Sequence, residues 1–132
     1  MTYESIFKPE LFSDQVIIVT GGGSGIGRCT AHELAAIGAT VVLTGRRIEK
    51  LETVAAEIRE DGGKADVIAF DIRDEDAVIA SVSDILARHG KIDGLVNNAG
   101  GQFPARLEDI SNNGWNAVVA TNLTGGFLVS RE

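Results

Sequence analysis

Short apolar runs recur along the chain about every 25 residues, and this rhythm constrains the fold more than any other feature of the sequence. The runs are rich in β-branched residues and predict strands over residues 15–20, 40–44, 65–70 and 92–97. Between them, apolar residues at helical spacing predict helices over residues 26–37, 48–59 and 74–89. Strand–helix units of this length form parallel sheets covered on both faces, with right-handed crossovers. The sequence therefore predicts an α/β fold with a doubly wound parallel sheet in the strand order 3-2-1-4.

The two ends of the chain lie outside this rhythm. Residues 1–14 are polar, so we expect an N-terminal arm followed by one domain over residues 15–132. After the fourth strand, Ser111 is predicted to cap a helix that carries an apolar stripe, with Trp115 in the core. The sequence ends within this helix, without a Gly or Pro stop signal. We therefore expect a sheet truncated after the fourth strand and its following helix.

Charge and composition disfavour several classes of partner. Nineteen acidic residues against twelve Lys and Arg give a net charge of −7, whereas nucleic-acid-binding domains usually carry a basic excess. The longest unbroken aliphatic run, Val16–Val19, is far shorter than the ~20 residues of a membrane span. The only cysteine is Cys29, the first residues lack a secretory pattern, and neither His32 nor His89 has metal-ligand spacing. We therefore expect a cytoplasmic protein with no metal site and no nucleic-acid or membrane partner.

A glycine-rich turn separates the first predicted strand from the first predicted helix. Residues Thr20–Gly27 read TGGGSGIG, which spaces glycines as T-G-x-x-x-G-x-G. Gly21 permits a tight turn, Gly25 lets the backbone approach a pyrophosphate, and Gly27 lets the helix pack close to the sheet. The N–H groups at the start of the helix then point at the phosphates, as in a Rossmann-type dinucleotide site. The alternative is a Gly-rich turn without a ligand.

This turn resembles the cofactor signature of the short-chain dehydrogenase/reductase family. The segment LVNNAG, Leu95–Gly100, follows the fourth predicted strand and resembles a second motif of the same family. The resemblance extends from about residue 14 to the end of the chain. It implies an oxidoreductase that transfers hydride between a nicotinamide and an alcohol, carbonyl or enoyl-CoA substrate, with this chain as the cofactor-binding half. The implied cofactor-binding residues in the two motifs are Thr20, Gly21, Gly23, Ser24, Gly25, Ile26, Gly27, Asn98, Ala99 and Gly100.

The end of the second strand favours NADP over NAD. An NAD site carries an acidic residue about 20 residues beyond the glycines, but no Asp or Glu lies between Leu34 and Ile48. Gly45 stands where NAD-dependent members usually carry Asp, and Arg46 and Arg47 follow it. Guanidinium groups suit paired hydrogen bonds to a phosphate, so we expect them to bind the 2′-phosphate of NADP. The alternatives are a solvated helix start at either arginine and NAD as the cofactor.

Three further roles rest on the resemblance alone. It implies that Asp71 and the backbone of Ile72 hold the adenine; the alternative for Asp71, a helix N-cap, suits Asp74 better. It also implies that Asn122 belongs to the catalytic machinery and uses its backbone to hold a water leading to the catalytic Lys. The alternative for Asn122 is a buried amide satisfied within a helix bend.

The family's Ser and Tyr-x-x-x-Lys are not found in residues 1–132. The single tyrosine is Tyr3, and Phe7 stands four residues after it. We therefore expect these residues alone to be inactive, and a nucleotide-binding or interaction module without catalysis is the competing hypothesis.

The substrate branch is suggested by the extra Gly101 with Gln102–Phe103, and by NGWNAVVATNLTG over residues 113–125. These segments resemble the branch that contains peroxisomal-type trans-2-enoyl-CoA reductases, together with relatives acting on long acyl or terpenoid alcohols and aldehydes. The resemblance implies a small-molecule substrate, either an acyl-CoA or a hydrophobic alcohol or aldehyde. It also implies a homo-oligomer, dimeric or tetrameric, for a full-length protein.

Overall fold

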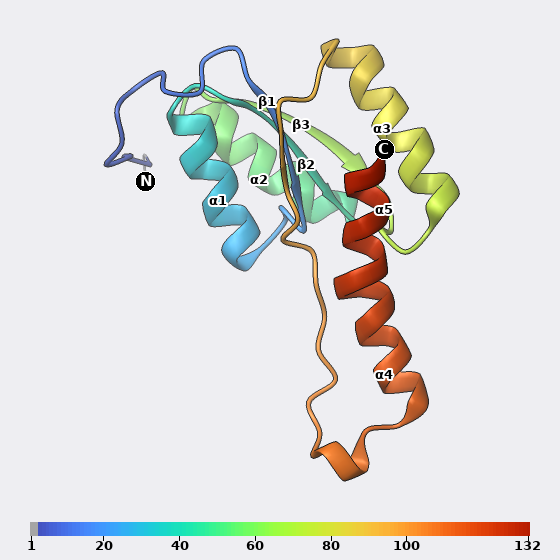
Figure 1. Cartoon of the computed structure of the whole chain (residues 1–132). Coiled ribbons are helices and arrows are strands. Elements are labelled where there is room, and N and C mark those ends of the chain that lie inside the picture. Colours follow the sequence, from blue (N-terminus) through green and yellow to red (C-terminus); the bar gives the residue numbers. More distant parts are fainter. Residues whose placement is uncertain (1–2) are drawn as a thin grey trace.

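The computed structural model describes residues 3–132 and holds one four-stranded sheet (Figure 1). All pairings are parallel, and the order of the strands is β3-β2-β1-β4. The strands are β1 (Val16–Thr20), β2 (Thr40–Gly45), β3 (Lys64–Ala69) and β4 (Gly94–Val96). The doubly wound parallel sheet and the order 3-2-1-4 that the sequence predicts are thereby confirmed.

Helices cover both faces of this sheet. On one face lie α1 (Gly25–Ala36) and α2 (Ile48–Glu60), and on the other lie α3 (Glu75–His89) and α5 (Gly126–Arg131) (Figure 1). A short 3-10 turn, η1 (Leu107–Asp109), precedes α4 (Asn112–Val119). Helix α4 continues through the π-helical η2 (Ala120–Gly125) into α5 as one long coil that projects past the sheet. None of the helices described is long and apolar enough to cross a membrane.

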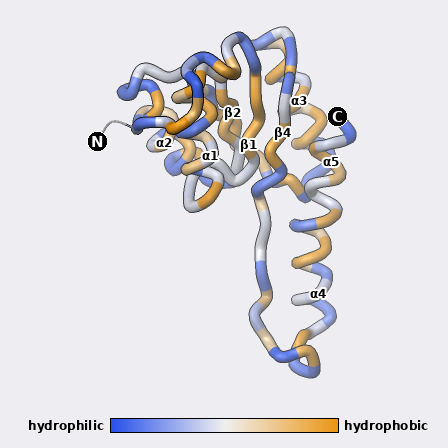
Figure 2. Tube along the Cα trace, turned by 60° about the vertical axis from the view of Figure 1, so that its left-hand side comes forward, coloured by the Kyte–Doolittle hydropathy of each residue, from blue (hydrophilic) through white to orange (hydrophobic). Residues whose placement is uncertain are grey.

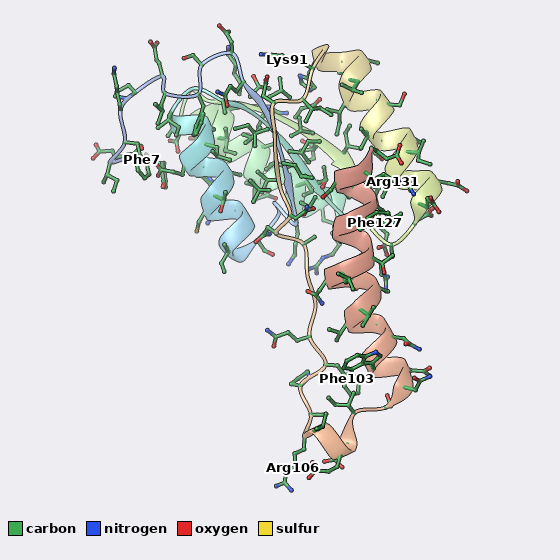
Figure 3. All side chains as sticks on the ribbon, in the orientation of Figure 1. Phe7, Lys91, Phe103, Arg106, Phe127 and Arg131 are labelled. Atoms are coloured by element: carbon green, nitrogen blue, oxygen red, sulfur yellow. The ribbon has the colours of Figure 1, made fainter. Side chains whose placement is uncertain are left out.

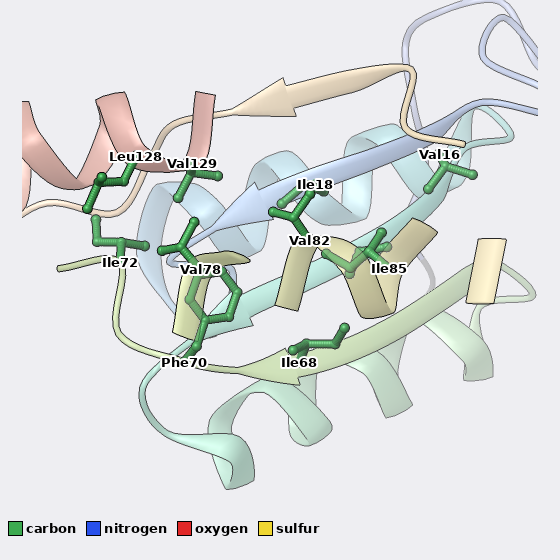
Figure 4. Packing of buried hydrophobic residues seen from close by; sticks show 11 residues of the cluster. Val16, Ile18, Ile68, Phe70, Ile72, Val78, Val82, Ile85, Leu128 and Val129 are labelled. Carbon is green, nitrogen blue, oxygen red and sulfur yellow. The ribbon is translucent and has the colours of Figure 1, made fainter. Parts of the chain in front are cut away.

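The strands divide the core into two layers because successive side chains point to opposite faces. Val19 of β1 belongs to the layer under α1 and α2, whereas Val16 and Ile18 belong to the layer under α3 and α5 (Figure 4). Figure 2 shows β1 and β2 as mainly hydrophobic segments. Such runs are expected for parallel strands buried on both faces.

The side chain of Trp115, predicted to lie in the core, is exposed, and so is that of Leu86 on α3. Trp115 is 58% exposed, because α4 projects past the sheet (Figure 1). Leu86 is 43% exposed, because it follows the buried Ile85 by one residue and so lies about 100° further around the helix. In the projecting segment Phe103 packs on α4: a Cβ atom at Gly114 would lie 2.7 Å from the Phe103 ring (Figure 3).

The predicted helix caps are confirmed. The Asp74 carboxylate accepts a hydrogen bond from the Ala77 N–H at 3.1 Å, and the Ser111 hydroxyl accepts one from the Gly114 N–H at 3.0 Å. Each bond satisfies an N–H group that a helix start would otherwise leave free. The two caps fix where α3 and α4 begin.

Residues 3–14 lie along the end of α1. The Phe12 N–H donates to the Ile37 carbonyl oxygen at 2.9 Å. The hydroxyls of Tyr3 and Ser5 both donate to the Glu33 carboxylate. The hydrogen bond to Glu33 raises the pKa of Tyr3 to about 12. The arm therefore lies at the opposite end of α1 from the glycine-rich turn.

Asp66 connects the edge strand β3 to α3. Its carboxylate accepts a hydrogen bond from the Val67 N–H at 2.8 Å and lies 3.0 Å from His89 Nε2 and 3.3 Å from an Arg88 nitrogen. Burial opposes its charge, but the hydrogen bonds from Val67, His89 and Arg88 outweigh burial and lower the pKa of Asp66. The ionised carboxylate therefore stabilises the contact between strand and helix.

We expect Asp66→Asn to lower the melting temperature near neutral pH by about 4 °C, since a partly exposed ion pair contributes about 1 kcal/mol. A carboxylate with a lowered pKa stabilises the fold above its unfolded-state pKa, and that contribution is lost as the pH falls through the folded-state pKa. The variant should therefore approach the wild type in stability below about pH 4. Thermal unfolding across the acid range measures this. Asp84→Asn, which removes only the exposed partner of Arg88 on α3, is the control, and an equal loss in both variants would contradict the prediction.

Candidate functional site

A cavity of about 360 Å³ lies outside the carboxyl ends of the strands, where doubly wound sheets bind ligands. Its walls come from the turns that follow all four strands and from the middle of the projecting helix. The lining residues are Gly21, Gly23, Ser24, Gly45, Arg46, Arg47, Lys50, Leu51, Phe70, Asp71, Ile72, Arg73, Asn98, Ala99, Gly100, Gly101 and Thr121.

The glycine-rich turn forms one wall, and its glycines serve different purposes. At Gly27 a Cβ atom would lie 2.4 Å from both the Gly21 carbonyl oxygen and Asn98 Nδ2, so only glycine lets α1 approach this closely. Gly21 has a φ of +67° and Gly25 a φ of +54°, conformations that L side chains rarely adopt. Nothing lies within 4 Å of a Cβ built at Gly25, so the backbone there faces open space.

Thr20 and Asn98 clamp the turn to the end of β4. The Thr20 hydroxyl, 1% exposed, accepts hydrogen bonds from the N–H groups of Asn98 at 3.1 Å and Ala99 at 2.9 Å. In return, Asn98 Nδ2 donates to the carbonyl oxygens of Thr20 at 2.9 Å and Gly21 at 3.3 Å. These bonds join the two family-like motifs directly. Their effect is to hold the backbone of Ala99 and Gly100 at the cavity wall.

The positive side of the cavity lies at the end of β2. Arg46, Arg47 and Lys50 are exposed, and none of them forms an ion pair within residues 3–132. In the same cavity wall, the N-terminus of α1 has no side-chain hydrogen bond from its cap residue Ser24. Free N–H groups and unpaired cations together favour an anionic ligand. The residues present therefore fit the phosphate groups of a dinucleotide.

Asp71 supplies the one carboxylate among the lining residues. Its oxygens accept hydrogen bonds from the Arg73 side chain, the shortest at 2.6 Å, and from the Arg73 N–H at 3.0 Å. The bond from the Arg73 side chain, with a smaller contribution from the charge of Arg46, lowers the pKa of Asp71 to about 2. Asp71 is therefore ionised and remains a hydrogen-bond acceptor at neutral pH.

Asn122 lies in the π-helical turn η2 and uses its side chain to hold the loop after β4. Its Nδ2 donates to the carbonyl oxygens of Gly101 at 2.7 Å and Val118 at 2.9 Å, and its Oδ1 accepts from the Gly101 N–H at 3.2 Å. The amide is satisfied within a helix distortion but is exposed rather than buried. Single π-helical turns of this kind are frequent at functional sites.

The structure brings most of the residues predicted from the sequence to one cavity. Ten of the fourteen predicted cofactor-binding positions line it, whereas Thr20, Gly25, Ile26 and Gly27 shape the turn behind it or lie beside it, and Asn122 is not among the lining residues. Sequence reasoning missed the lining residues Lys50, Leu51, Phe70, Arg73, Gly101 and Thr121. A signal existed for Lys50, which lies in the first turn of the predicted helix over residues 48–59, shortly after Arg46 and Arg47. The described residues contain no cluster suited to a metal ion.

Comparison with known proteins decides the family. The sequence profile described as short chain dehydrogenase matches residues 15–132. The chain belongs to the short-chain dehydrogenase family.

Among curated members of the short-chain dehydrogenase family, two illustrate the range of similarity. Gluconate 5-dehydrogenase of Gluconobacter oxydans is 42% identical over 125 residues, covering 93% of this chain and 49% of the relative. Peroxisomal 2,4-dienoyl-CoA reductase of Danio rerio is 35% identical over 130 residues, covering 98% of this chain and 43% of the relative. The chain thus spans about half the length of these relatives.

Solved structures of family members match the fold closely. A citronellol catabolism dehydrogenase of Pseudomonas aeruginosa PAO1 is 62% identical with a TM-score of 0.94, over 98% of this chain and 53% of that one. A metagenomic short-chain oxidoreductase in complex with NADP is 44% identical with a TM-score of 0.84, over 90% and 54% of the two chains. An NAD+-bound xylitol dehydrogenase is 38% identical with a TM-score of 0.88, over 92% and 47%. Both nicotinamide cofactors therefore occur among the matches.

We expect Gly27→Ala to lower the free energy of unfolding by about 2 kcal/mol, because the added methyl group meets backbone 2.4 Å away and cannot be accommodated without moving α1. Denaturant unfolding measures the change. Ile26→Ala, which truncates a neighbouring side chain that is 79% exposed, should change stability by less than about 0.5 kcal/mol. A Gly27→Ala variant as stable as the wild type would show that α1 does not pack as described.

Proposed function

We propose that residues 15–132 form the NADP-binding half of an oxidoreductase of the short-chain dehydrogenase family. The observation that carries the proposal is the charge arrangement of the cavity. Among residues 3–132, Arg46 and Arg47 at the end of β2 form no ion pair, and no acidic residue lies between Leu34 and Ile48 to accept a ribose hydroxyl. NADP differs from NAD in the 2′-phosphate, which these guanidiniums suit.

The proposed binding roles follow the walls of the cavity. The backbone from Gly21 to Gly27 and the N–H groups at the start of α1 bind the pyrophosphate; Gly23, Ser24, Gly25 and Ile26 belong to this segment. Arg46 pairs with the 2′-phosphate, and Arg47 adds positive charge beside it. Asp71 accepts a hydrogen bond from the adenine amino group beside the Ile72 backbone. The small residues Ala99 and Gly100, held by Thr20 and Asn98, leave room for the ribose and nicotinamide.

The bound nicotinamide would supply hydride exchange with the substrate carbon. Within residues 3–132, Asn122 is the residue we propose for the catalytic machinery, in a positioning role. Its side chain is occupied by Gly101 and Val118, so its contribution comes from the backbone of the π-helical turn, where a main-chain carbonyl can hold a water. Proton transfer to the substrate oxygen requires a further acid, which residues 1–132 do not supply as a Tyr-x-x-x-Lys. We therefore expect these residues alone not to turn over substrate.

For the substrate class we propose a hydrophobic alcohol or aldehyde. The support is the 62% identity to a citronellol catabolism dehydrogenase. An acyl-CoA substrate is the second candidate, supported by the 35% identity to a 2,4-dienoyl-CoA reductase.

We also propose a homo-oligomer in the cytoplasm. The exposed Trp115, Leu123 and Phe127 on the projecting helix support association, and the single cysteine supports a reducing compartment.

We expect Arg46→Ala to weaken NADPH binding about tenfold or more while changing NADH binding by less than about threefold, since a charge-assisted contact to phosphate contributes about 1.5–3 kcal/mol. Fluorescence titration of the full-length protein with each cofactor measures the two dissociation constants. The matched control is Arg106→Ala, which removes an exposed arginine on the projecting segment (Figure 3). Equal affinity of the wild type for NADPH and NADH would contradict the proposed preference for NADP.

A further inference from the structure

Two cations and one carboxylate meet where β2 and β3 end. Gly45 of β2 lies opposite Ala69 of β3, and the Gly45 carbonyl oxygen accepts the Phe70 N–H at 2.9 Å. Arg46 comes one residue after β2 and Asp71 two residues after β3, and both line the same cavity. The charge of Arg46 acts on Asp71, yet the two side chains form no ion pair. Arg46 therefore shares the cavity with a carboxylate that it does not pair with.

Arg73 occupies the carboxylate instead. Its Nε lies 3.0 Å from Asp71 Oδ1 and 3.2 Å from Oδ2, and its Nη2 donates to Oδ2 at 2.6 Å. The Arg73 backbone N–H donates to Oδ1 at 3.0 Å. A carboxylate offers about four acceptor positions, so these three donor groups of Arg73, with Nε shared between both oxygens, occupy most of them. This two-point pairing also fixes the direction in which the carboxylate faces.

The turn that carries Asp71 and Arg73 is held in place by a hydrogen bond and by packing against η2. The Asp74 N–H donates to the Asp71 carbonyl oxygen at 3.0 Å and closes the turn. The Ile72 side chain is 7% exposed and packs so closely on η2 that a Cβ at Gly125 would lie 2.7 Å from it. The pair of Asp71 and Arg73 is therefore held on a well-anchored turn at the cavity wall.

We propose that Arg73 determines cofactor specificity by positioning: it holds the Asp71 carboxylate and so keeps Arg46 free for the 2′-phosphate of NADP. The inference rests on the proposed function. A carboxylate released from Arg73 would compete with the 2′-phosphate for Arg46, and its uncompensated negative charge would repel that phosphate. NADH lacks the phosphate, so its binding is insensitive to this competition.

The test measures dissociation constants for NADPH and NADH with the natural full-length protein and three variants. Arg73→Gln should weaken NADPH binding about tenfold, as expected when a charge-assisted contact is lost, and NADH binding by less than about threefold. Asp71→Asn removes the competing charge and affects the adenine contact of both cofactors alike. The double variant Arg73→Gln/Asp71→Asn should therefore return the NADPH-to-NADH ratio to within about threefold of the Asp71→Asn ratio. Circular dichroism confirms that each variant is folded.

Recovery of the ratio separates positioning from a direct contact, because a lost Arg73–phosphate bond would not return when Asp71 is changed. If the wild type prefers NADPH and Arg73→Gln leaves the NADPH-to-NADH ratio unchanged, the role of Arg73 is overturned but the proposed NADP preference stands. A double variant whose NADPH-to-NADH ratio is as low as that of Arg73→Gln also overturns the role of Arg73. A wild type that binds both cofactors equally overturns the NADP preference itself and this inference with it.

Discussion

The close approach of α1 to the sheet at Gly27 is the constraint on which the rest of the structure depends. With no side chain there, the Gly21 carbonyl oxygen and Asn98 Nδ2 occupy space that any Cβ would fill. Asn98 can then donate to the carbonyls of Thr20 and Gly21, and the Thr20 hydroxyl accepts from the loop after β4. One missing methyl group thus lets two distant segments form a single wall, with the start of α1 aimed into the cavity.

Charge is distributed around this wall in a way that the pairing of side chains explains. Asp71 is the one acidic residue in the lining of the cavity, and its carboxylate is paired with Arg73. Arg46, Arg47 and Lys50 form no ion pairs within the described chain, so their charge is available to a ligand. Buried hydrophobic layers on both faces of the sheet fix the strands from which these turns extend. Under the proposed function, cofactor specificity depends on Asp71 pairing with Arg73 and not with Arg46.

Much of the fold was predictable because it follows from local periodicity. β-branched runs and helical stripes predicted the elements, right-handed crossovers limited the topology to a doubly wound sheet, and the Rossmann-type order then followed from the doubly wound rule. The caps at Asp74 and Ser111 were predictable for the same reason, since each bonds within its own first turn. Trp115 was placed wrongly because its environment depends on how far α4 projects past the sheet, which an apolar stripe does not encode.

The position of the site was predictable from the sequence, but the contacts that each side chain makes were less so. Thr20 and Asn98 were expected at the cofactor, and the structure shows them also bonding to each other across 78 positions of sequence. Arg73 carried no periodic signal, because its significance lies in the tertiary meeting of β2 and β3. Asn122 engages Gly101 through its side chain, a contact that only the folded loop creates.

The most direct test of the account is a crystal structure of the full-length protein grown with NADPH. The account predicts the pyrophosphate against the backbone at Gly25, the 2′-phosphate within hydrogen-bond distance of the Arg46 guanidinium, and Asp71 still paired with Arg73 beside the adenine. A nucleotide bound elsewhere, or a 2′-phosphate that faces solvent away from Arg46, would contradict it.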